Sequence, residues 1–168
     1  MLDSSTFINA CYIARIQLLI LLRSPIFFPE YVFRVELGVN AHPTTRREAE
    51  SWVQKKKIGI RQLSLSDLDR ISELAAPRRI GLGEIACAIV AEREGGGVLC
   101  DDHKGRNWLQ SRLATTCWQS VEDFLLHAAE LGYVSEFDLQ ACQETLESNR
   151  YLCRYDLRLE HLRRAANR

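Results

Sequence analysis

The chain has 168 residues, of which 46% are apolar and 26% charged, close to the average of soluble globular proteins. This composition excludes a disordered chain, a fibrous chain and a coiled coil, and the length suits one domain, residues 1–168, with a single core. Acidic and basic residues balance at 22 each, so the overall charge does not indicate a nucleic-acid binder. Any such role must rest on local charge.

Cysteine usage and the apolar segments indicate a cytoplasmic protein. The six cysteines show no Cys-x-x-Cys spacing and fall mostly in apolar segments, which is typical of free thiols in a reducing compartment. The most apolar stretch, residues 16–28, contains Gln17, Arg23 and Pro25 and is shorter than the roughly 20 residues of a membrane span. It could equally form a buried helix or part of a homodimer interface. Asp3 stands where a secretory signal would be basic, so no signal is expected.

In the first half of the chain, short apolar runs alternate with amphipathic stretches. Pro29 suits the first turn of a helix, and two Ser/Thr-x-x-acid pairs resemble capping boxes. The expected elements are a very short strand at 1–2, a helix through 7–12, a helix from Pro29 to Gly38, a charged helix from Thr45 to about Lys57, a strand over 58–63 and a helix from Ser66 to before Pro77.

The second half continues the alternation. The expected elements are a helix over Glu84–Glu94, a strand over 98–100, a helix over about 106–113, a strand over 114–117, a helix from Ser120 to near Gly132, a helix from Ser135 and a last helix from about Asp156. This order predicts an α/β fold with a largely parallel sheet.

Acidic residues follow predicted strands or begin predicted helices. They are Asp3, Glu84, Asp101 and Asp102. In a parallel sheet the carboxyl ends of the strands share one edge, so these acids could meet although they lie far apart in sequence. Crowded carboxylates repel each other and are normally tolerated because a cation binds them, and Mg²⁺ prefers oxygen ligands. The pattern therefore suits metal-dependent hydrolysis of phosphodiesters.

Each acid also has a purely structural interpretation. Asp3 could be the N-cap of the first helix, and Glu84 could simply favour the N-terminal end of its helix dipole. Asp101 and Asp102 could be turn and cap residues. Only their joint occurrence favours a functional site. A Walker-type phosphate loop is excluded, because Gly95-Gly96-Gly97 is not followed by Lys-Ser/Thr.

Four segments together resemble PIN-domain proteins. They are Met1-Leu2-Asp3-Ser4-Ser5, residues 81–89 (GLGEIACAI), residues 98–106 (VLCDDHKGR) and residues 121–135 (VEDFLLHAAELGYVS). The resemblance extends over nearly the whole chain. It implies a three-layer α/β/α sandwich with a largely parallel sheet of about five strands, and an acidic pocket that binds Mg²⁺ or Mn²⁺.

By position, the resemblance implies roles for individual residues. Asp3, Glu84 and the pair Asp101 and Asp102 would be metal ligands and catalytic residues, positioning water for in-line attack on phosphorus. Substrate-binding roles would fall to Ser5, Lys104 and Arg106, although the two basic side chains could also be merely solvated. The implied function is an endoribonuclease, often the toxin partner of a small antitoxin and often a dimer.

The chain departs from the family pattern in two places. Only Met1 and Leu2 precede Asp3, so the first strand would be very short or would begin further upstream. The acid expected after Pro29 lies one residue late, at Glu36, with Val35 in its place, so either the helix is shifted or this metal ligand is missing. The alternative function is therefore an inactive relative that binds RNA or a protein without cleaving it.

Overall fold

The computed structural model describes residues 1–75, 80–113 and 117–167, and most of these residues are helical. The helices are α1 (Ser4–Tyr12), α2 (Ile16–Arg23), the π-helix η1 (Val32–Asn40), α3 (Pro43–Gln54), α4 (Leu65–Ala75), α5 (Leu82–Glu94), α6 (His103–Gln110), α7 (Val121–Glu130), α8 (Glu136–Ser148) and α9 (Leu157–Ala166). The strands are β1 (Ile26–Pro29), β2 (Ile58–Arg61), β3 (Val98–Leu99) and β4 (Trp118–Gln119).

The predicted sandwich around a five-stranded parallel sheet is wrong. Within the described residues the strands form two small parallel sheets, β1 with β2 and β3 with β4. Between them, Leu2 makes one isolated parallel bridge to Leu99, in which the N–H of Leu99 donates to the Met1 carbonyl at 2.8 Å and the N–H of Asp3 donates to the Leu99 carbonyl at 2.9 Å. On the other side, the N–H of Leu2 donates to the Phe27 carbonyl at 2.9 Å. Asp3 already caps α1, so the strand expected at residues 1–2 is reduced to this bridge.

One further prediction needs correction, and another lies mostly outside the described residues. The apolar stretch over residues 16–28, interpreted as one helix or an interface segment, divides into α2 and the strand β1. The strand predicted over residues 114–117 falls largely on residues 114–116, which lie outside the described residues, and β4 begins at Trp118. In the described part of the chain, every helix is too short or too polar to cross a membrane.

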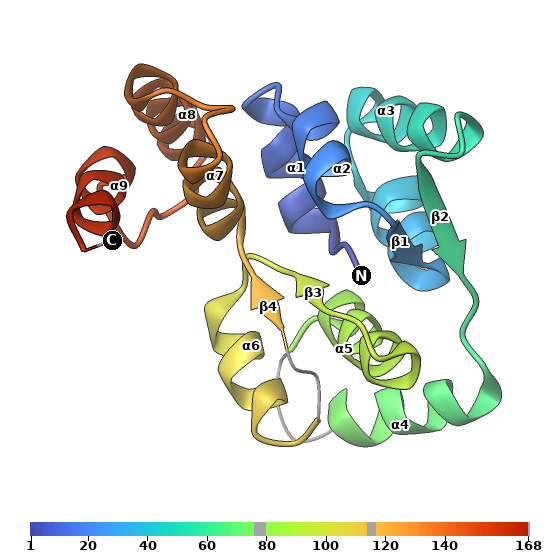
Figure 1. Ribbon diagram of the computed structural model, residues 1–168. Helices are drawn as coiled ribbons and strands as arrows, with labels where there is room; N and C mark the ends of the chain where they lie inside the picture. The colour runs from blue at the N-terminus through green and yellow to red at the C-terminus, as the bar shows by residue number, and fades with distance from the viewer. Residues whose placement is uncertain (76–79, 114–116, 168) are drawn as a thin grey trace.

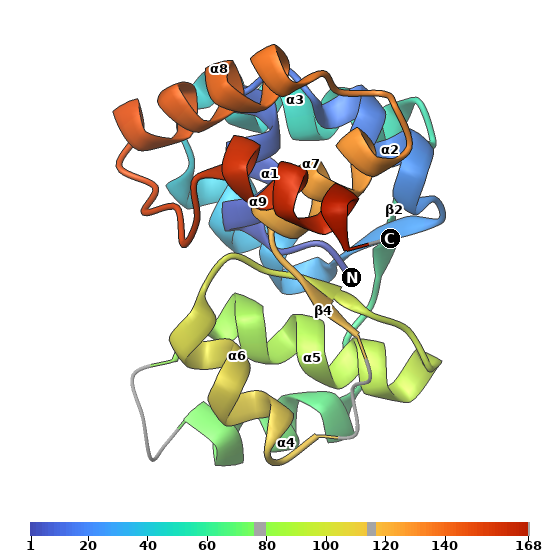
Figure 2. The same cartoon turned by 60° about the vertical axis from the view of Figure 1, so that its left-hand side comes forward.

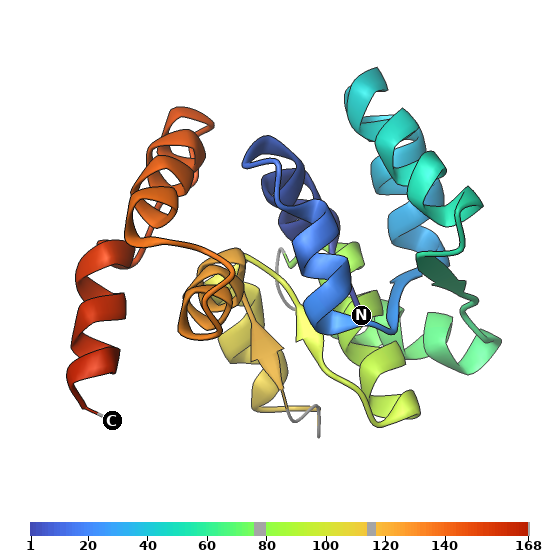
Figure 3. The same cartoon turned by 45° about the horizontal axis from the view of Figure 1, so that its top comes forward.

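Helices lie on both sides of the strands. Figure 2 shows α4, α5 and α6 on one side, and α1, α2, α3, α7, α8 and α9 on the other. The N-terminus lies beside the strands (Figure 1), while α8 and α9 lie at one end of the molecule and α3 lies at the opposite end (Figure 3). The starts of α1, α5 and α6 therefore come close together near the strands.

One cluster of buried apolar side chains extends from Leu2 to Leu157. Helix α5 is apolar on all sides and its residues 85–91 are fully buried, as expected of a helix covered on every face. The ring of Phe28 contacts Phe7 edge-on, with centroids 5.3 Å apart, and stacks on Phe33 at 6.1 Å. These aromatic contacts fix α1, β1 and η1 against each other.

The predicted helix starts at Ser120 and Ser135 are confirmed. Ser120 with Asp123 caps α7, and Ser135 with Asp138 caps α8, each with reciprocal bonds between side chain and backbone. Two other helices begin earlier than predicted. Pro43 opens α3 behind the N-cap His42, as its missing N–H favours, and Asp67 accepts a 2.8 Å bond from the N–H of Ser64 at the start of α4.

Candidate functional site

Asp3 lies at the start of α1 and is only 3% exposed. Its Oδ2 accepts hydrogen bonds from the backbone N–H of Ser5 at 3.2 Å and from the Ser5 hydroxyl at 2.5 Å. Burial raises the pKa of Asp3, while the two bonds from Ser5 oppose that increase. Asp3 is thus both an N-cap and a buried acid, and the Ser5 hydroxyl is oriented by it.

Glu36 lies in the π-helix η1 and contacts the starts of α1 and α5. Oε2 of Glu36 accepts a 2.5 Å hydrogen bond from the Ser4 hydroxyl, and Oε1 accepts a 3.2 Å bond from the N–H of Gly83. The displaced acid therefore belongs to the candidate site.

Two glycines make room for the acidic side chains. A Cβ placed on Gly83 would lie 2.3 Å from Oε1 of Glu36, and a Cβ on Gly105 would lie 2.0 Å from Oε2 of Glu84. Both distances are far inside van der Waals contact, so any larger residue would have to displace a carboxylate. The Gly-Glu start of α5 and the glycine in the first turn of α6 thus leave the space that the carboxylates of one acidic cluster occupy.

Asp102 adds the fourth carboxylate to this cluster from the start of α6, where its charge acts on Glu84. It is solvent-exposed, and its Oδ1 accepts hydrogen bonds from the N–H groups of Lys104 at 2.7 Å and Gly105 at 3.1 Å. Asp102 is therefore the N-cap of α6, and it is the solvent-exposed member of the cluster.

Burial and the charges of neighbouring acids raise the pKa values of Glu84 and Glu36. Burial, and then the negative charges of Asp102, Asp3 and Glu36, raise the pKa of Glu84 to about 9. Burial, followed by the charge of Asp3, raises the pKa of Glu36. Oε2 of Glu84 is buried and accepts no hydrogen bond from the described residues. With no cation bound, Glu84 therefore holds a proton at neutral pH.

Asp101 has a different environment from the other acids. Its Oδ2 accepts a 2.7 Å hydrogen bond from the Asn9 amide, and its Oδ1 accepts a 2.7 Å bond from the N–H of Val121. Burial raises its pKa to about 6. Both oxygens are thus used to join α1 and the start of α7 to the end of β3, which is a structural task.

The two basic residues assigned to the substrate differ in availability. Lys104 is exposed beside Asp102. Arg106 is half-buried, with Nη1 3.6 Å from Oδ2 of Asp123, so its charge is balanced within the protein. Lys104 is the better placed of the two to meet a phosphate.

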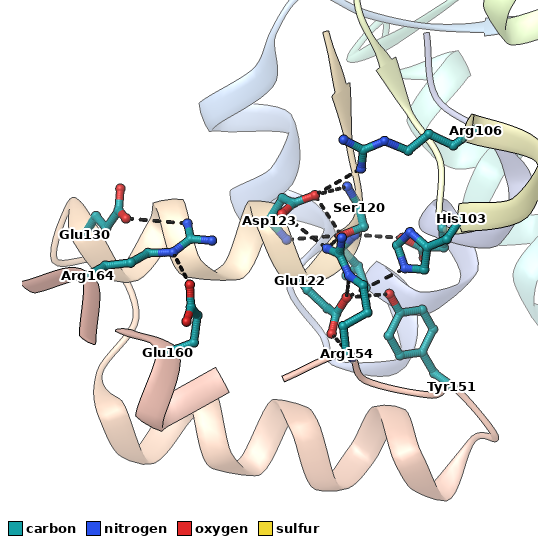
Figure 4. Close-up of polar contacts among 12 residues, drawn as sticks. His103, Arg106, Ser120, Glu122, Asp123, Glu130, Tyr151, Arg154, Glu160 and Arg164 are labelled. Carbon is teal, nitrogen blue, oxygen red and sulfur yellow. Dashed lines mark hydrogen bonds and ion pairs between the residues drawn. The ribbon is translucent and has the colours of Figure 1, made fainter. Parts of the chain in front are cut away.

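A polar network at the starts of α6 and α7 was not predicted from the sequence (Figure 4). Glu122 is fully buried and accepts hydrogen bonds from the Arg154 backbone N–H at 2.6 Å, the Arg154 Nε at 2.7 Å and the Tyr151 hydroxyl at 3.3 Å. Arg154 also donates to the Ser120 hydroxyl, and His103 lies 3.8 Å from Glu122. The network attaches the segment between α8 and α9 to the starts of α6 and α7. In the sequence, Glu122 is visible only as an acid between Ser120 and Asp123, the two residues that cap α7.

Comparison of the chain with protein-family models, with curated proteins and with solved structures gave no match. Within residues 1–75, 80–113 and 117–167, no three His, Cys, Asp or Glu side chains are already arranged to hold one metal ion. The carboxylates point instead to hydroxyl and backbone donors. The donor set nevertheless fits a hard divalent cation, since it is all oxygen and includes the unpartnered buried Oε2 of Glu84.

Proposed function

We propose that this chain is a metal-dependent ribonuclease whose site consists of Asp3, Glu36, Glu84 and Asp102. The observation that carries the proposal is that four carboxylates from four separate elements form one cluster, in which burial and then the charges of Asp102, Asp3 and Glu36 raise the pKa of Glu84 to about 9. Two glycines leave the space that these side chains occupy. Such crowding costs stability, and a divalent cation would relieve it.

The acids of the cluster would have different roles because they differ in burial. Asp3 and Glu36 are held by hydrogen bonds from Ser5, Ser4 and Gly83, so their oxygens are fixed in position. Asp102 is solvent-exposed, so an RNA phosphate would reach the cluster beside it, where Lys104 would pair with the phosphate. When bound, Mg²⁺ or Mn²⁺ would supply a Lewis acid and an activated water for phosphodiester hydrolysis.

The proposal includes the setting suggested by the resemblance to PIN-domain proteins. In that setting the protein is a cytoplasmic toxin that pairs with a small antitoxin and forms a homodimer. The free state of all six cysteines supports a reducing compartment. The second candidate function is a catalytically inactive module that binds RNA or a protein, and it is favoured by the absence of a ready-made metal geometry in the described residues.

A cleavage assay separates the two candidates. Purified protein is incubated with a labelled structured RNA in Mn²⁺ and in EDTA, together with Asp102→Asn. Asparagine is as good an N-cap as aspartate, so this variant keeps the cap of α6 and loses the charge. Asp69→Asn, on the exposed face of α4, is the matched control. The nuclease requires metal-dependent cleavage that Asp102→Asn abolishes and Asp69→Asn retains, whereas EDTA-insensitive binding without cleavage indicates the binding module.

A further inference from the structure

A pocket lies away from the acidic cluster, between the α1–α2 hairpin and α3. Its volume is about 590 Å³, within the usual range of small-molecule sites. Apolar groups from Cys11, Ile16 and Trp52 line it, together with the ring of Tyr12. None of the four proposed metal ligands lines this pocket, so it is independent of the proposed function.

Glu48 gives this pocket its charge. It is the one formally charged side chain among the described residues that line the pocket, counting histidine as neutral. Its Oε1 accepts a 2.8 Å hydrogen bond from the indole N–H of Trp52, one helical turn further along α3. Its Oε2 accepts no hydrogen bond from the described part of the chain, which leaves it available to a donor from outside.

The negative charge of Glu48 acts within the pocket. Burial, and then the charge of Glu48, raise the pKa of the Cys11 thiol to about 12, so Cys11 stays a neutral apolar group. The ammonium of Lys55 lies 5.0 Å from the centroid of the Trp52 ring, but Lys55 does not line the pocket. The ammonium of Lys55 therefore does not fill the space between Tyr12, Trp52 and Glu48.

Aromatic faces beside a single carboxylate are a recurrent arrangement for organic cations, because the ring faces and the carboxylate are all negative. The apolar floor requires carbon atoms in the ligand as well. We infer that this pocket binds a small organic amine, with its alkyl chain against Trp52 and Ile16 and its ammonium group at Oε2 of Glu48. An inorganic cation would leave the apolar floor uncovered, and an anion would meet Glu48.

The probe for the test is n-hexylammonium, with 1-hexanol and hexanoate as neutral and anionic matches of the same chain length. The indole N–H of Trp52 reports on binding, because it is bonded to Glu48, and its NMR signal is assigned with Trp52→Phe. We expect a saturable shift with hexylammonium and at least about fivefold weaker binding of the two other compounds. Equal binding of hexanol, or no shift with hexylammonium, would overturn the inference.

Two variants locate the charge. Glu48→Gln keeps an acceptor for Trp52 and removes the charge, so its affinity for hexylammonium should fall at least about fivefold. Glu50→Gln, on the exposed side of the same helix, should bind like the wild type. An unchanged affinity in Glu48→Gln contradicts the inference. The comparison of the three ligands on the wild-type protein decides the question even if Glu48→Gln folds poorly.

Discussion

The Ser4 hydroxyl donates a 2.5 Å hydrogen bond to Oε2 of Glu36, joining the first turn of α1 to the middle of η1. The other oxygen of Glu36 accepts from the N–H of Gly83 in α5. Glu36 is therefore tied to the two helices whose starts carry Asp3 and Glu84. This arrangement makes the position of each acid depend on its neighbours, and the predictions below test that dependence.

The first prediction concerns the space beside Glu84. Gly105→Ala places a Cβ 2.0 Å from the present position of Oε2 of Glu84. The flexible carboxylate of Glu84 must therefore move away from residue 105. Alanine favours a helix over glycine by about 1 kcal/mol, so α6 should be at least as stable as before. We expect RNA cleavage to fall about tenfold or more, while the free energy of unfolding in urea stays the same or rises.

Gly96→Ala is the control for this substitution, because a Cβ there would meet nothing within 4 Å. Its cleavage rate should equal that of the wild type. Full activity of Gly105→Ala would show that Glu84 need not occupy its observed position, and the proposed site would then lose one of its four members.

The second prediction concerns pH. The pKa of Glu84 is about 9 in the folded protein and 4.5 ordinarily, so the folded state holds the proton more tightly. The resulting stabilisation is complete below about pH 4.5 and is lost as the pH rises toward 9. In EDTA, the unfolding temperature should therefore fall by roughly 5 °C between pH 6 and pH 9. Mn²⁺ should reduce this fall, because a cation replaces the proton.

Calorimetry of Glu84→Gln checks the assignment of this pH effect. The amide is neutral throughout, so the fall in unfolding temperature should be smaller than in the wild type, and the remainder reflects Asp3 and Glu36, whose pKa values are also raised. Glu73→Gln, exposed on α4, should keep the full pH dependence. If Glu84→Gln and the wild type have the same profile, Glu84 is not the group that titrates.

Local signals in the sequence were sufficient for much of the helical structure. The helix starts at Ser120 and Ser135 were predicted correctly, because the bonds that cap these helices join residues three apart. The sheet was not, because a strand depends on partners elsewhere in the chain: Leu2 alone bridges to Leu99, and β3 and β4 have two residues each. A short apolar run does not show whether it will find enough partners.

The candidate site shows the same limit. Asp3, Glu84 and Asp102 were predicted from their positions at strand ends and helix starts, and the structure brings them close enough for their charges to act on one another. The position of Glu36 could not be decided, since α-helical periodicity does not reveal a π-helix. The bonds between Glu122 and Arg154 join residues 32 apart, and nothing local in the sequence indicates them.

The third prediction concerns the Glu122–Arg154 pair. Arg154→Ala leaves the fully buried carboxylate of Glu122 without its main partner, an arrangement that is strongly destabilising. We expect the free energy of unfolding to fall by about 2–4 kcal/mol, reduced from the fully buried case because Arg154 is partly exposed. Adding Glu122→Gln should recover part of the loss. Arg158→Ala, which removes an exposed pair with Glu136, should change stability by less than about 1 kcal/mol.

The fourth prediction separates the adjacent aspartates. Asp101→Asn places an amide where both oxygens of Asp101 accept bonds, so its NH₂ group faces either the Asn9 amide or the N–H of Val121. One buried donor then loses its acceptor, at a cost of about 1–3 kcal/mol. Cleavage per folded molecule should remain within about threefold of the wild type, because the four proposed ligands are unchanged. Asp102→Asn should do the opposite, abolishing cleavage with little loss of stability. Unfolding in urea and cleavage under native conditions, measured on both variants, check these opposite effects on stability and activity. If Asp101→Asn lost as much activity as Asp102→Asn, Asp101 would count among the metal ligands again.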